Sequence, residues 1–429
     1  MKLFSYDKLT RSALNALVQR PSGNMNDIMP QVAAIVGEVC AEGDAALRRF
    51  TKKFDGVEVR QFKVEEEKFK DVNLKVDAAT TEAIADAARA IEAFHLPQVP
   101  RTIEVETSPG VVCRREWRSI QRVGLYIPGG SAPLISTVLM LGIPARLAHC
   151  QEVSLCTPPS RNGSVLPEIL LAAQITGIRN VYAIGGAQAI GALAAGTESI
   201  PKVDKIFGPG NRYVAAAKSV VSQPPYNVAV DAIAGPTELM VIADDSANPC
   251  WVTADLLSQA EHGADSQVVL VTTSEAFAEK VEKEIAGQVT DLPRREVIQQ
   301  SMEQSFALVV QNMDQALIFA NEYSPEHLII AVRDAETIAP NVVNAGSVFL
   351  GGRSSVVFGD YASGTNHTLP TNCTARSTGG VTVECFMKPV FFQTVNAQGS
   401  ASLAPTVKSL ARAEHLEAHA RAVELRKNP

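Results

Sequence analysis

The sequence predicts an α/β fold with two parallel-sheet units, and three observations support this prediction. Short apolar runs of strand length alternate with segments of helix length from about residue 123 onward. Glycine-rich turns follow several of these runs, as they do where a strand leads into a helix. The chain has 429 residues, 46% of them hydrophobic and 20% charged, which is enough for more than one buried core. Strand–helix alternation of this kind is typical of a parallel sheet flanked by helices.

The first hundred residues are expected to be mainly helical. Residues 1–22 form a short polar arm, and apolar residues recur at helical spacing between residues 30 and 95. A second helix is predicted from Thr81 to Phe94, capped by one of the threonines at its start. Residues 102–117 have the pattern of a β-hairpin, with Pro109-Gly110 supplying the turn.

Two α/β units then follow one another along the chain. The predicted strands of the earlier unit are 123–127, 153–156, 181–184 and 205–207, with helices at 133–148, 166–176, 187–195 and from Asn211. Those of the later unit are 239–243, 268–272, 306–310, 328–332 and 348–350, with helices at 249–262 and 275–286. We therefore expect one domain at 124–234 and another that combines 23–123 with 235–375. Segment 376–429 is expected to begin extended and to end in one long helix over 401–425.

The charge balance and the cysteines limit the partners and the compartment. The formal net charge is −7, from 46 acidic and 39 basic side chains, so no general attraction to nucleic acid or to an anionic membrane is expected. The sequence shows no signal-peptide pattern and no apolar run of about 18 residues. The seven cysteines are irregularly spaced without a C-x-x-C pair, which favours a reducing, cytoplasmic location over a disulfide framework.

Three glycine-rich turns are candidates for binding a phosphate group. They are Gly129-Gly130 after Tyr126, Gly185-Gly186 before Gln188, and Gly208-Pro209-Gly210 before Asn211. In an open parallel sheet, ligands bind at the carboxyl ends of the strands, where glycine lets the backbone approach a phosphate near a helix N-terminus. None of the turns has the full G-x-G-x-x-G pattern of a dinucleotide fold. The sequence therefore predicts incomplete Rossmann-like units, with ordinary tight turns as the alternative.

Two pairs of side chains indicate a metal site and an acid–base site. Gln259 and His262 lie about 60° apart on one helix face, so both could reach one metal ion. Glu326 and His327 stand at the entrance of an apolar strand, where an adjacent acid and imidazole suit proton transfer. A structural histidine is the alternative for the first pair, and a solvated loop pair is the alternative for the second.

Two loops are further candidates. The stretch Asp231–Glu238 is poor in bulky side chains, which fits either close approach to a ligand or an interdomain hinge. The polar loop 358–367 holds Asp360 and His367 after a predicted buried strand, and binding residues concentrate on such loops.

The last predicted helix contains a possible metal pair. Spacing alone would pair His415 with His419, four residues apart on one face. Glu414 lies about 140° from His419 around an ideal helix, so the bare pattern does not select it. A solvated charged face is the alternative for this helix.

Seven short segments, in this order and spacing, resemble the L-histidinol dehydrogenase family. They are Gly-Leu-Tyr-Ile-Pro-Gly-Gly from Gly124, Gly-Gly-Ala-Gln-Ala from Gly185, Phe-Gly-Pro-Gly-Asn from Phe207, Ala-Gly-Pro-Thr-Glu from Ala234, Asp-Leu-Leu-Ser-Gln-Ala-Glu-His-Gly from Asp255, Ser-Pro-Glu-His-Leu from Ser324 and Gly-Thr-Asn-His-Thr-Leu-Pro-Thr from Gly364. The match runs from about residue 25 to the end of the chain. The resemblance implies an NAD-dependent enzyme with one zinc ion per subunit that oxidises L-histidinol to L-histidine, in the last steps of histidine biosynthesis.

The resemblance also implies roles for individual residues. Zinc would be held by the residues that match the family's metal ligands, Gln259, His262, Asp360 and His419. The substrate would contact these four and also Thr237, His327, His367 and Glu414. NAD would contact Tyr126, Gln188 and Asn211, on the domain 124–234, while the other domain would carry metal and substrate. Family members are homodimers that exchange their C-terminal segments, so Glu414 and His419 would complete the site of the other subunit.

The hypothesised mechanism has two oxidations. His327 removes the alcohol proton while hydride passes to NAD, Glu326 then activates water to hydrate the aldehyde, and a second NAD takes the second hydride. A covalent route through Cys113 or Cys150 is the rival within this chemistry. The alternatives to a dehydrogenase are a zinc hydrolase, with Glu326 activating a zinc-bound water, and a nucleotide- or metal-binding protein without turnover.

Overall fold

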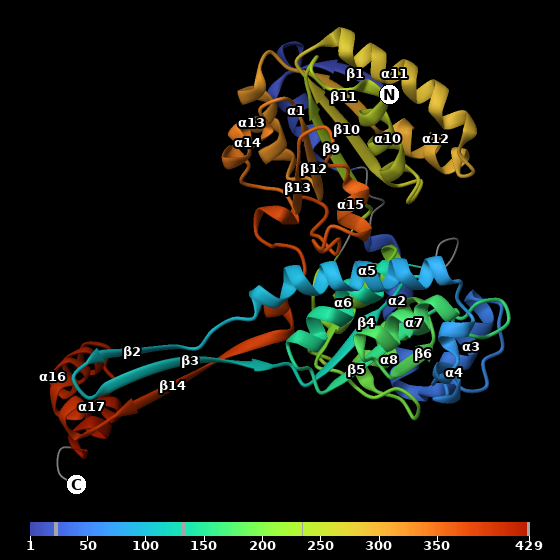
Figure 1. Cartoon of the computed structure of the whole chain (residues 1–429). Coiled ribbons are helices and arrows are strands. Elements are labelled where there is room, and N and C mark those ends of the chain that lie inside the picture. Colours follow the sequence, from blue (N-terminus) through green and yellow to red (C-terminus); the bar gives the residue numbers. More distant parts are fainter. Residues whose placement is uncertain (21–24, 130–133, 234, 427–429) are drawn as a thin grey trace.

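The computed structural model describes residues 1–20, 25–129, 134–233 and 235–426. Within these ranges the chain forms two parallel α/β units and a long antiparallel arm that projects from them (Figure 1). Gly130 and Ala234, which belong to two of the sequence motifs, lie outside the described residues. No helix in the described ranges is long and apolar enough to cross a membrane.

The strands predicted for the earlier unit form a five-stranded parallel sheet in the order β6-β5-β4-β7-β8. Its strands are β4 (Arg122–Tyr126), β5 (Glu152–Thr157), β6 (Asn180–Ala183), β7 (Lys205–Phe207) and β8 (Ala229–Val230). One face packs against α5 (Ala78–His95), α6 (Ile135–Leu147) and α7 (Pro167–Thr176). The other packs against α2 (Met29–Glu42), α3 (Asp44–Phe54), α8 (Gly186–Ala195) and α9 (Arg212–Val221). The short helix α4 (Glu67–Lys70) precedes α5.

The later unit has a six-stranded parallel sheet in the order β1-β11-β10-β9-β12-β13. Its strands are β1 (Lys2–Ser5), β9 (Glu238–Ala243), β10 (Gln267–Thr272), β11 (Phe306–Val309), β12 (His327–Ala331) and β13 (Ser347–Leu350). Its helices are α1 (Arg11–Val18), α10 (Pro249–Ala260), α11 (Glu275–Gln288), α12 (Arg295–Gln304), α13 (Met313–Tyr323), α14 (Ala335–Ile338) and α15 (Val356–Tyr361). Every residue of β9 and β10 is buried, as expected for central strands covered on both faces.

The structure divides the chain differently from the sequence prediction. Residues 1–20 do not form a separate arm, because β1 pairs in parallel with β11 at the edge of the six-stranded sheet. Helices α2, α3 and α5 have their apolar faces on the five-stranded sheet and were expected to pair with 235–375, which the end of α5 touches only at 364–366. An amphipathic pattern shows which face of a helix is buried but not which sheet covers it. Helix α5 is also capped by Asp77, whose side chain accepts from the Thr80 N–H, rather than by a threonine.

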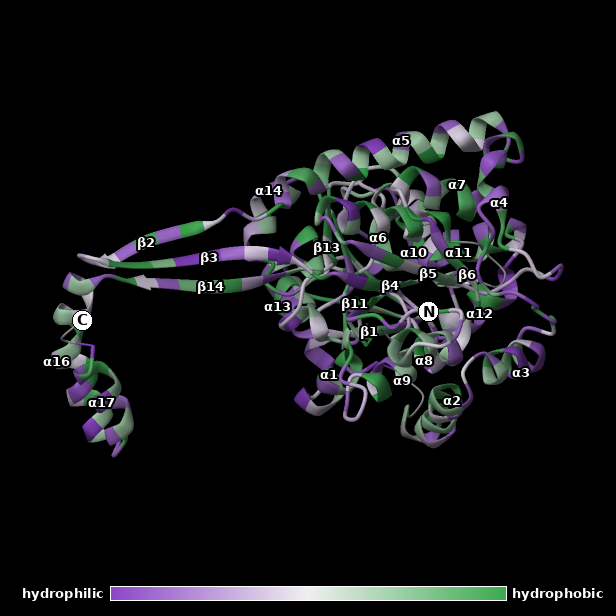
Figure 2. Cartoon of the chain, turned by 90° about the horizontal axis from the view of Figure 1, so that it is seen from below, coloured by the Kyte–Doolittle hydropathy of each residue, from purple (hydrophilic) through white to green (hydrophobic). Residues whose placement is uncertain are grey.

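The arm consists of β2 (Ile103–Ser108), β3 (Val111–Ser119) and β14 (Met387–Val395) in one antiparallel sheet. The predicted hairpin is therefore confirmed, and β14 adds a third strand to it. Helices α16 (Ala397–Ala413) and α17 (Glu417–Glu424) lie at the tip (Figures 1 and 2). The prediction of one helix over 401–425 is wrong, because His415 adopts a left-handed conformation, φ 60°, that ends the first helix.

Candidate active site

The amino ends of β9 and β12 bring the predicted acid–base pair next to Thr237 and Glu238. The two strands run parallel with His327 opposite Leu239, so Glu326 is level with Glu238. Both strands are central in the sheet and apolar along their length, which fixes their register and so the position of the residues that precede them. The site therefore forms at the amino-terminal edge of the six-stranded sheet.

Glu326 is buried, and one of its carboxylate oxygens is held by two donors. The Thr237 hydroxyl donates to Oε2 at 2.6 Å, and the Glu238 backbone N–H donates to the same oxygen at 2.9 Å. Burial outweighs these hydrogen bonds and raises the pKa of Glu326 to about 8. The side chain thus combines a fixed position with the proton affinity of a general base or acid that works near neutral pH.

His327 has one ring nitrogen engaged and one free. Its Nδ1 lies 3.1 Å from the backbone oxygen of Glu238, and because a carbonyl can only accept, Nδ1 carries the proton. Nε2 then carries the lone pair, is buried without a hydrogen-bond partner, and lies 3.8 Å from Asp360 Oδ1. Burial lowers the pKa of His327, which keeps the ring neutral and Nε2 able to accept a proton.

Three of the four predicted zinc ligands surround this pair. Gln259, in the last turn of α10, donates to the Thr237 hydroxyl, while its Oε1 is buried without a hydrogen-bond partner. Asp360, in α15, has its pKa raised to about 6 because it is desolvated. His262 follows α10, and desolvation lowers its pKa. An orphaned amide oxygen, a carboxylate and a neutral imidazole are donors that zinc accepts, so these residues fit the ion.

His367 contacts the other α/β unit. Its Nε2 lies 3.1 Å from the hydroxyl of Ser136, in α6, and the neighbouring Asn366 donates to the backbone oxygen of Met140 at 2.7 Å. Desolvation lowers the pKa of His367 to about 4. The segment 358–367 therefore runs from Asp360, beside His327, to His367, which contacts the other unit.

Glu414 and His419 are not brought to this site. Both are exposed on the helices at the tip of the arm, far from the six-stranded sheet along the projecting strands (Figure 1). Among the described residues, no group of three or more histidine, cysteine, aspartate or glutamate side chains is placed to hold a metal ion. One chain thus assembles Gln259, His262 and Asp360 but not the fourth predicted ligand. His415 and His419 do not share one helix face, as their spacing suggested, because α16 ends before His415 and α17 begins only at Glu417.

The predicted cofactor residues line one cavity at the carboxyl edge of the five-stranded sheet. Its volume is about 810 Å³, and Tyr126, Gln188 and Asn211 all contribute to its wall. The Tyr126 hydroxyl accepts from the Gly186 N–H at 3.0 Å, and Asn211 caps α9 by accepting from two backbone N–H groups. The three glycine-rich turns therefore meet around a single space, as the carboxyl ends of parallel strands require.

A buried ion pair behind one of these turns was not predicted. Lys218 Nζ lies 2.5 Å from Asp231 Oδ1 and 2.5 Å from the backbone oxygen of Gly208, and Asp231 Oδ2 accepts from the Gly208 N–H at 2.7 Å. The pair fixes the turn relative to the segment that leads to Thr237. A lysine on the apolar side of α9 was the available signal, because a buried lysine needs a partner.

Comparisons with known proteins agree on one family. The family model described as "Histidinol dehydrogenase" matches residues 18–427. The chain is 47% identical over 428 residues to a histidinol dehydrogenase of Bacteroides thetaiotaomicron, covering 100% of this chain and 99% of that protein. It is 47% identical over 427 residues to the histidinol dehydrogenase of Xanthomonas euvesicatoria, covering 99% of each. The crystal structure of histidinol dehydrogenase from Elizabethkingia anophelis superposes with a TM-score of 0.95 at 46% identity, covering 99% of this chain and 98% of that one.

Proposed function

We propose roles for individual residues on the premise that this chain belongs to the histidinol dehydrogenase family. The protein is accordingly an NAD-dependent, zinc-binding oxidoreductase that converts L-histidinol to L-histidine in histidine biosynthesis. Because the chain belongs to this family, the two alternative functions, a zinc hydrolase and a binding protein without turnover, are excluded.

His327 is the base for the hydroxyl proton in both oxidations. The observation that carries this role is its buried Nε2, which has a lone pair and no partner, beside Asp360. The hydrogen bond from Nδ1 to the Glu238 carbonyl keeps that tautomer, so each proton is taken up at Nε2. When bound, NAD accepts the hydride of each oxidation and zinc, as a Lewis acid, orients the substrate.

Glu326 takes a proton from water between the two oxidations. Its buried carboxylate is held through Oε2 by Thr237 and Glu238, which leaves Oε1 to face the reaction. The same burial that raises its pKa to about 8 makes the ionised form a strong base. The hydroxide so formed adds to the aldehyde carbon, and the aldehyde oxygen takes the proton that His327 accepted in the first oxidation, which returns His327 to its neutral form. The resulting diol has a hydroxyl proton for His327 to take in the second oxidation. Cys113 and Cys150 are not needed in this route, and burial raises the pKa of the Cys150 thiol to about 12.

Zinc is held by Gln259, His262 and Asp360 of one subunit together with His419 of a second copy of this chain. Glu414 of that copy contacts the substrate, as do Thr237 and His367 of the first subunit. Two features support exchange of the arm. It projects away from the body (Figure 2), and it carries exposed apolar side chains such as Phe391, 76% exposed, and Leu410, 61% exposed. A homodimer with shared sites covers this surface and supplies the missing ligand.

Mixing two inactive variants tests the shared site. Asp360→Asn damages the body of a subunit, and His419→Asn damages its arm. In a hybrid dimer, one site receives both changes and the other receives neither, so random reassociation should restore about a quarter of the wild-type sites. Histidinol oxidation, followed as NADH formation, is measured before and after the two proteins are unfolded and refolded together. Refolding each variant alone is the control, and a mixture that stays inactive would count against exchange of the arm.

We also propose a cytoplasmic location. All seven cysteines are free in the structure, which suits a reducing compartment.

A further inference from the structure

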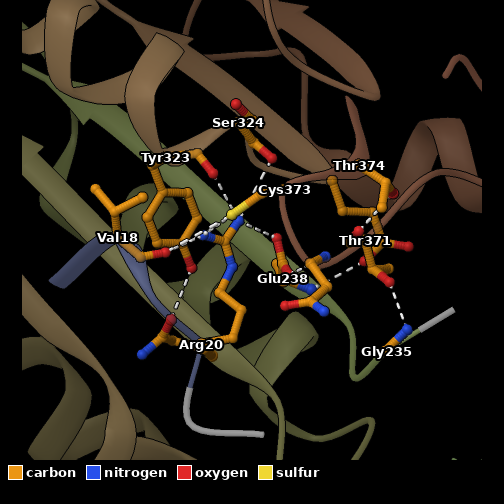
Figure 3. A network of polar contacts seen from close by, with 12 residues as sticks. Val18, Arg20, Gly235, Glu238, Tyr323, Ser324, Thr371, Cys373 and Thr374 are labelled. Carbon is orange, nitrogen blue, oxygen red and sulfur yellow. Dashed lines mark hydrogen bonds and ion pairs between the residues drawn. The ribbon is translucent and has the colours of Figure 1, made fainter. Parts of the chain in front are cut away.

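Arg20 lies in a buried network that joins four segments of the chain (Figure 3). Its side chain is 4% exposed, and its guanidinium forms an ion pair with Glu238 at 2.6 Å. The guanidinium donates to the backbone oxygens of Val18 at 2.7 Å and Tyr323 at 2.8 Å, and it stacks 3.4 Å from the centre of the Tyr323 ring. Cys373 completes the contacts, with its Sγ 3.3 Å from Arg20 Nη1. The sequence alone places Arg20 in a polar segment and gives it no role.

Glu238 connects this network to the proposed acid–base pair. Its Oε2 pairs with Arg20 and its Oε1 accepts from the Asn372 N–H at 2.7 Å, so both carboxylate oxygens are fixed. Its backbone N–H donates to Glu326 at 2.9 Å, and its backbone oxygen accepts from His327 at 3.1 Å. Glu238 is thus held through its side chain by Arg20, and it holds Glu326 and His327 through its main chain.

Stability alone explains the ion pair poorly. Removing two charges from water is costly, and a buried pair is often no more stabilising than apolar side chains of similar volume. The side chains of Arg20 and Glu238 are only 4% and 2% exposed, so this cost applies to both. What the pair does provide is orientation, because a guanidinium presents its donors in a rigid, planar fork.

We propose that Arg20 is a positioning residue for the oxidation of histidinol and that it acts through Glu238. By fixing the Glu238 side chain, Arg20 holds the start of β9 where its main chain keeps Nδ1 of His327 protonated and Glu326 in place. Arg20 also donates to the backbone oxygens of Tyr323 and Ser324, and so fixes the turn that leads into Glu326. This inference rests on the roles proposed above for Glu326 and His327.

Four variants of the full-length chain test the inference. Arg20→Met keeps an unbranched apolar side chain and removes the charge, whereas Arg20→Lys keeps the charge. Arg20→Met combined with Glu238→Gln removes the carboxylate that the single change leaves uncompensated. Arg11→Met is the matched control, because it removes an exposed ion pair with Glu322 from the same N-terminal segment. For each variant, kcat and KM for L-histidinol are measured per folded molecule, together with the thermal midpoint.

We expect Arg20→Met to lower kcat about 100-fold while KM changes much less, since a misplaced base slows the chemical step. Arg20→Lys should recover part of this loss, and the double variant should recover the thermal midpoint but not kcat. The control should match the wild type.

Two results would overturn the inference. One is a wild-type kcat per folded Arg20→Met molecule, and the other is a double variant that recovers both kcat and the thermal midpoint. Measuring Glu326→Gln and His327→Asn distinguishes a wrong role for Arg20 from wrong roles for Glu326 and His327. If both were fully active, the roles would be wrong. If both were impaired while Arg20→Met kept its kcat, only the role of Arg20 would be wrong.

Discussion

At the residue scale, the main chain of Glu238 is hydrogen-bonded to both proposed catalytic side chains, Glu326 and His327. Different atoms of the two side chains remain available for proton transfer. In the roles proposed for them, His327 takes the alcohol proton at its unpartnered Nε2, and Glu326 takes a proton from water at Oε1, the oxygen that Thr237 and Glu238 leave free. The two side chains should therefore be separable by mutation.

Glu326→Gln should stall the second oxidation more than the first. Glutamine is close in shape and can still accept from Thr237, but it cannot take a proton from water. We expect about a 100-fold loss in the oxidation of L-histidinaldehyde and a smaller loss in the first oxidation of L-histidinol. Single-turnover NADH formation with each substrate measures the two steps. His327→Asn should impair both, and an equal loss of both steps in Glu326→Gln would contradict the role of Glu326.

Asp55 gives a pH-dependent prediction away from the metal ligands. This half-buried carboxylate lines the cofactor cavity, its Oδ2 has no hydrogen-bond partner, and desolvation raises its pKa to about 6. Because the folded-state pKa lies above the ordinary aspartate value of 3.8, the ionised group destabilises the fold. That penalty is absent below about pH 4, grows between pH 4 and 6, and is complete above pH 6.

Asp55→Asn should therefore raise the thermal midpoint above pH 6 and leave it unchanged below pH 4. Thermal unfolding measured across this range tests the prediction. A stabilisation that does not depend on pH would show that the carboxylate is not the cause. Asp245→Asn, a change of the same type at an exposed position, is the control.

At the element scale, the strand and helix pattern was predicted well and the ends of elements less well. The parallel strands are short, buried and apolar, so their positions follow directly from hydropathy. The break between α16 and α17 was missed because it depends on one residue, His415, in a left-handed conformation that is uncommon for residues other than glycine. The third strand of the arm was missed because an exposed strand has no clear alternation to detect.

The turn after β7 gives a prediction at this scale. Gly208 has φ 123°, and a Cβ there would lie 2.0 Å from the backbone oxygen of Tyr126. Gly208→Ala should therefore displace the turn and raise KM for NAD by about tenfold or more, as overpacking against main chain does. Steady-state kinetics with NAD varied measures this effect.

Gly37→Ala is the matched control, since nothing lies within 4 Å of a Cβ at this helical glycine. It should leave KM for NAD unchanged and stabilise α2 by up to about 1 kcal/mol. If Gly208→Ala bound NAD as the wild type does, the turn would not be part of the cofactor site.

At the scale of the whole molecule, we expect the tip of the arm to be needed for activity but not for the folding of the two α/β units. The helices at its tip bury only small residues, Gly399, Ala404, Ala411 and Ala420. A chain that ends after Val395 should thus still fold, with a thermal midpoint lowered only by the loss of the dimer contacts proposed for the tip. It should also lose turnover and much of its zinc, because His419 is gone. Thermal unfolding, zinc content and NADH formation test these expectations, and a truncated chain with full turnover would contradict the shared site.

The sequence by itself determined the two parallel sheets, the order of their strands along the chain and the three glycine-rich turns at the carboxyl edge of the first sheet. These depend on local hydropathy and on turns that follow strands, which are short-range properties. It also indicated Glu326, His327, Gln259 and Asp360, through motifs that resemble one family.

Only the tertiary structure decided which sheet the N-terminal helices cover, and that Arg20 pairs with Glu238 across 218 residues. It also decided that Glu414 and His419 stand away from the body that holds the other ligands. Each of these depends on contacts between segments far apart in the chain, and a one-dimensional pattern records which faces are apolar or charged but not which face meets which.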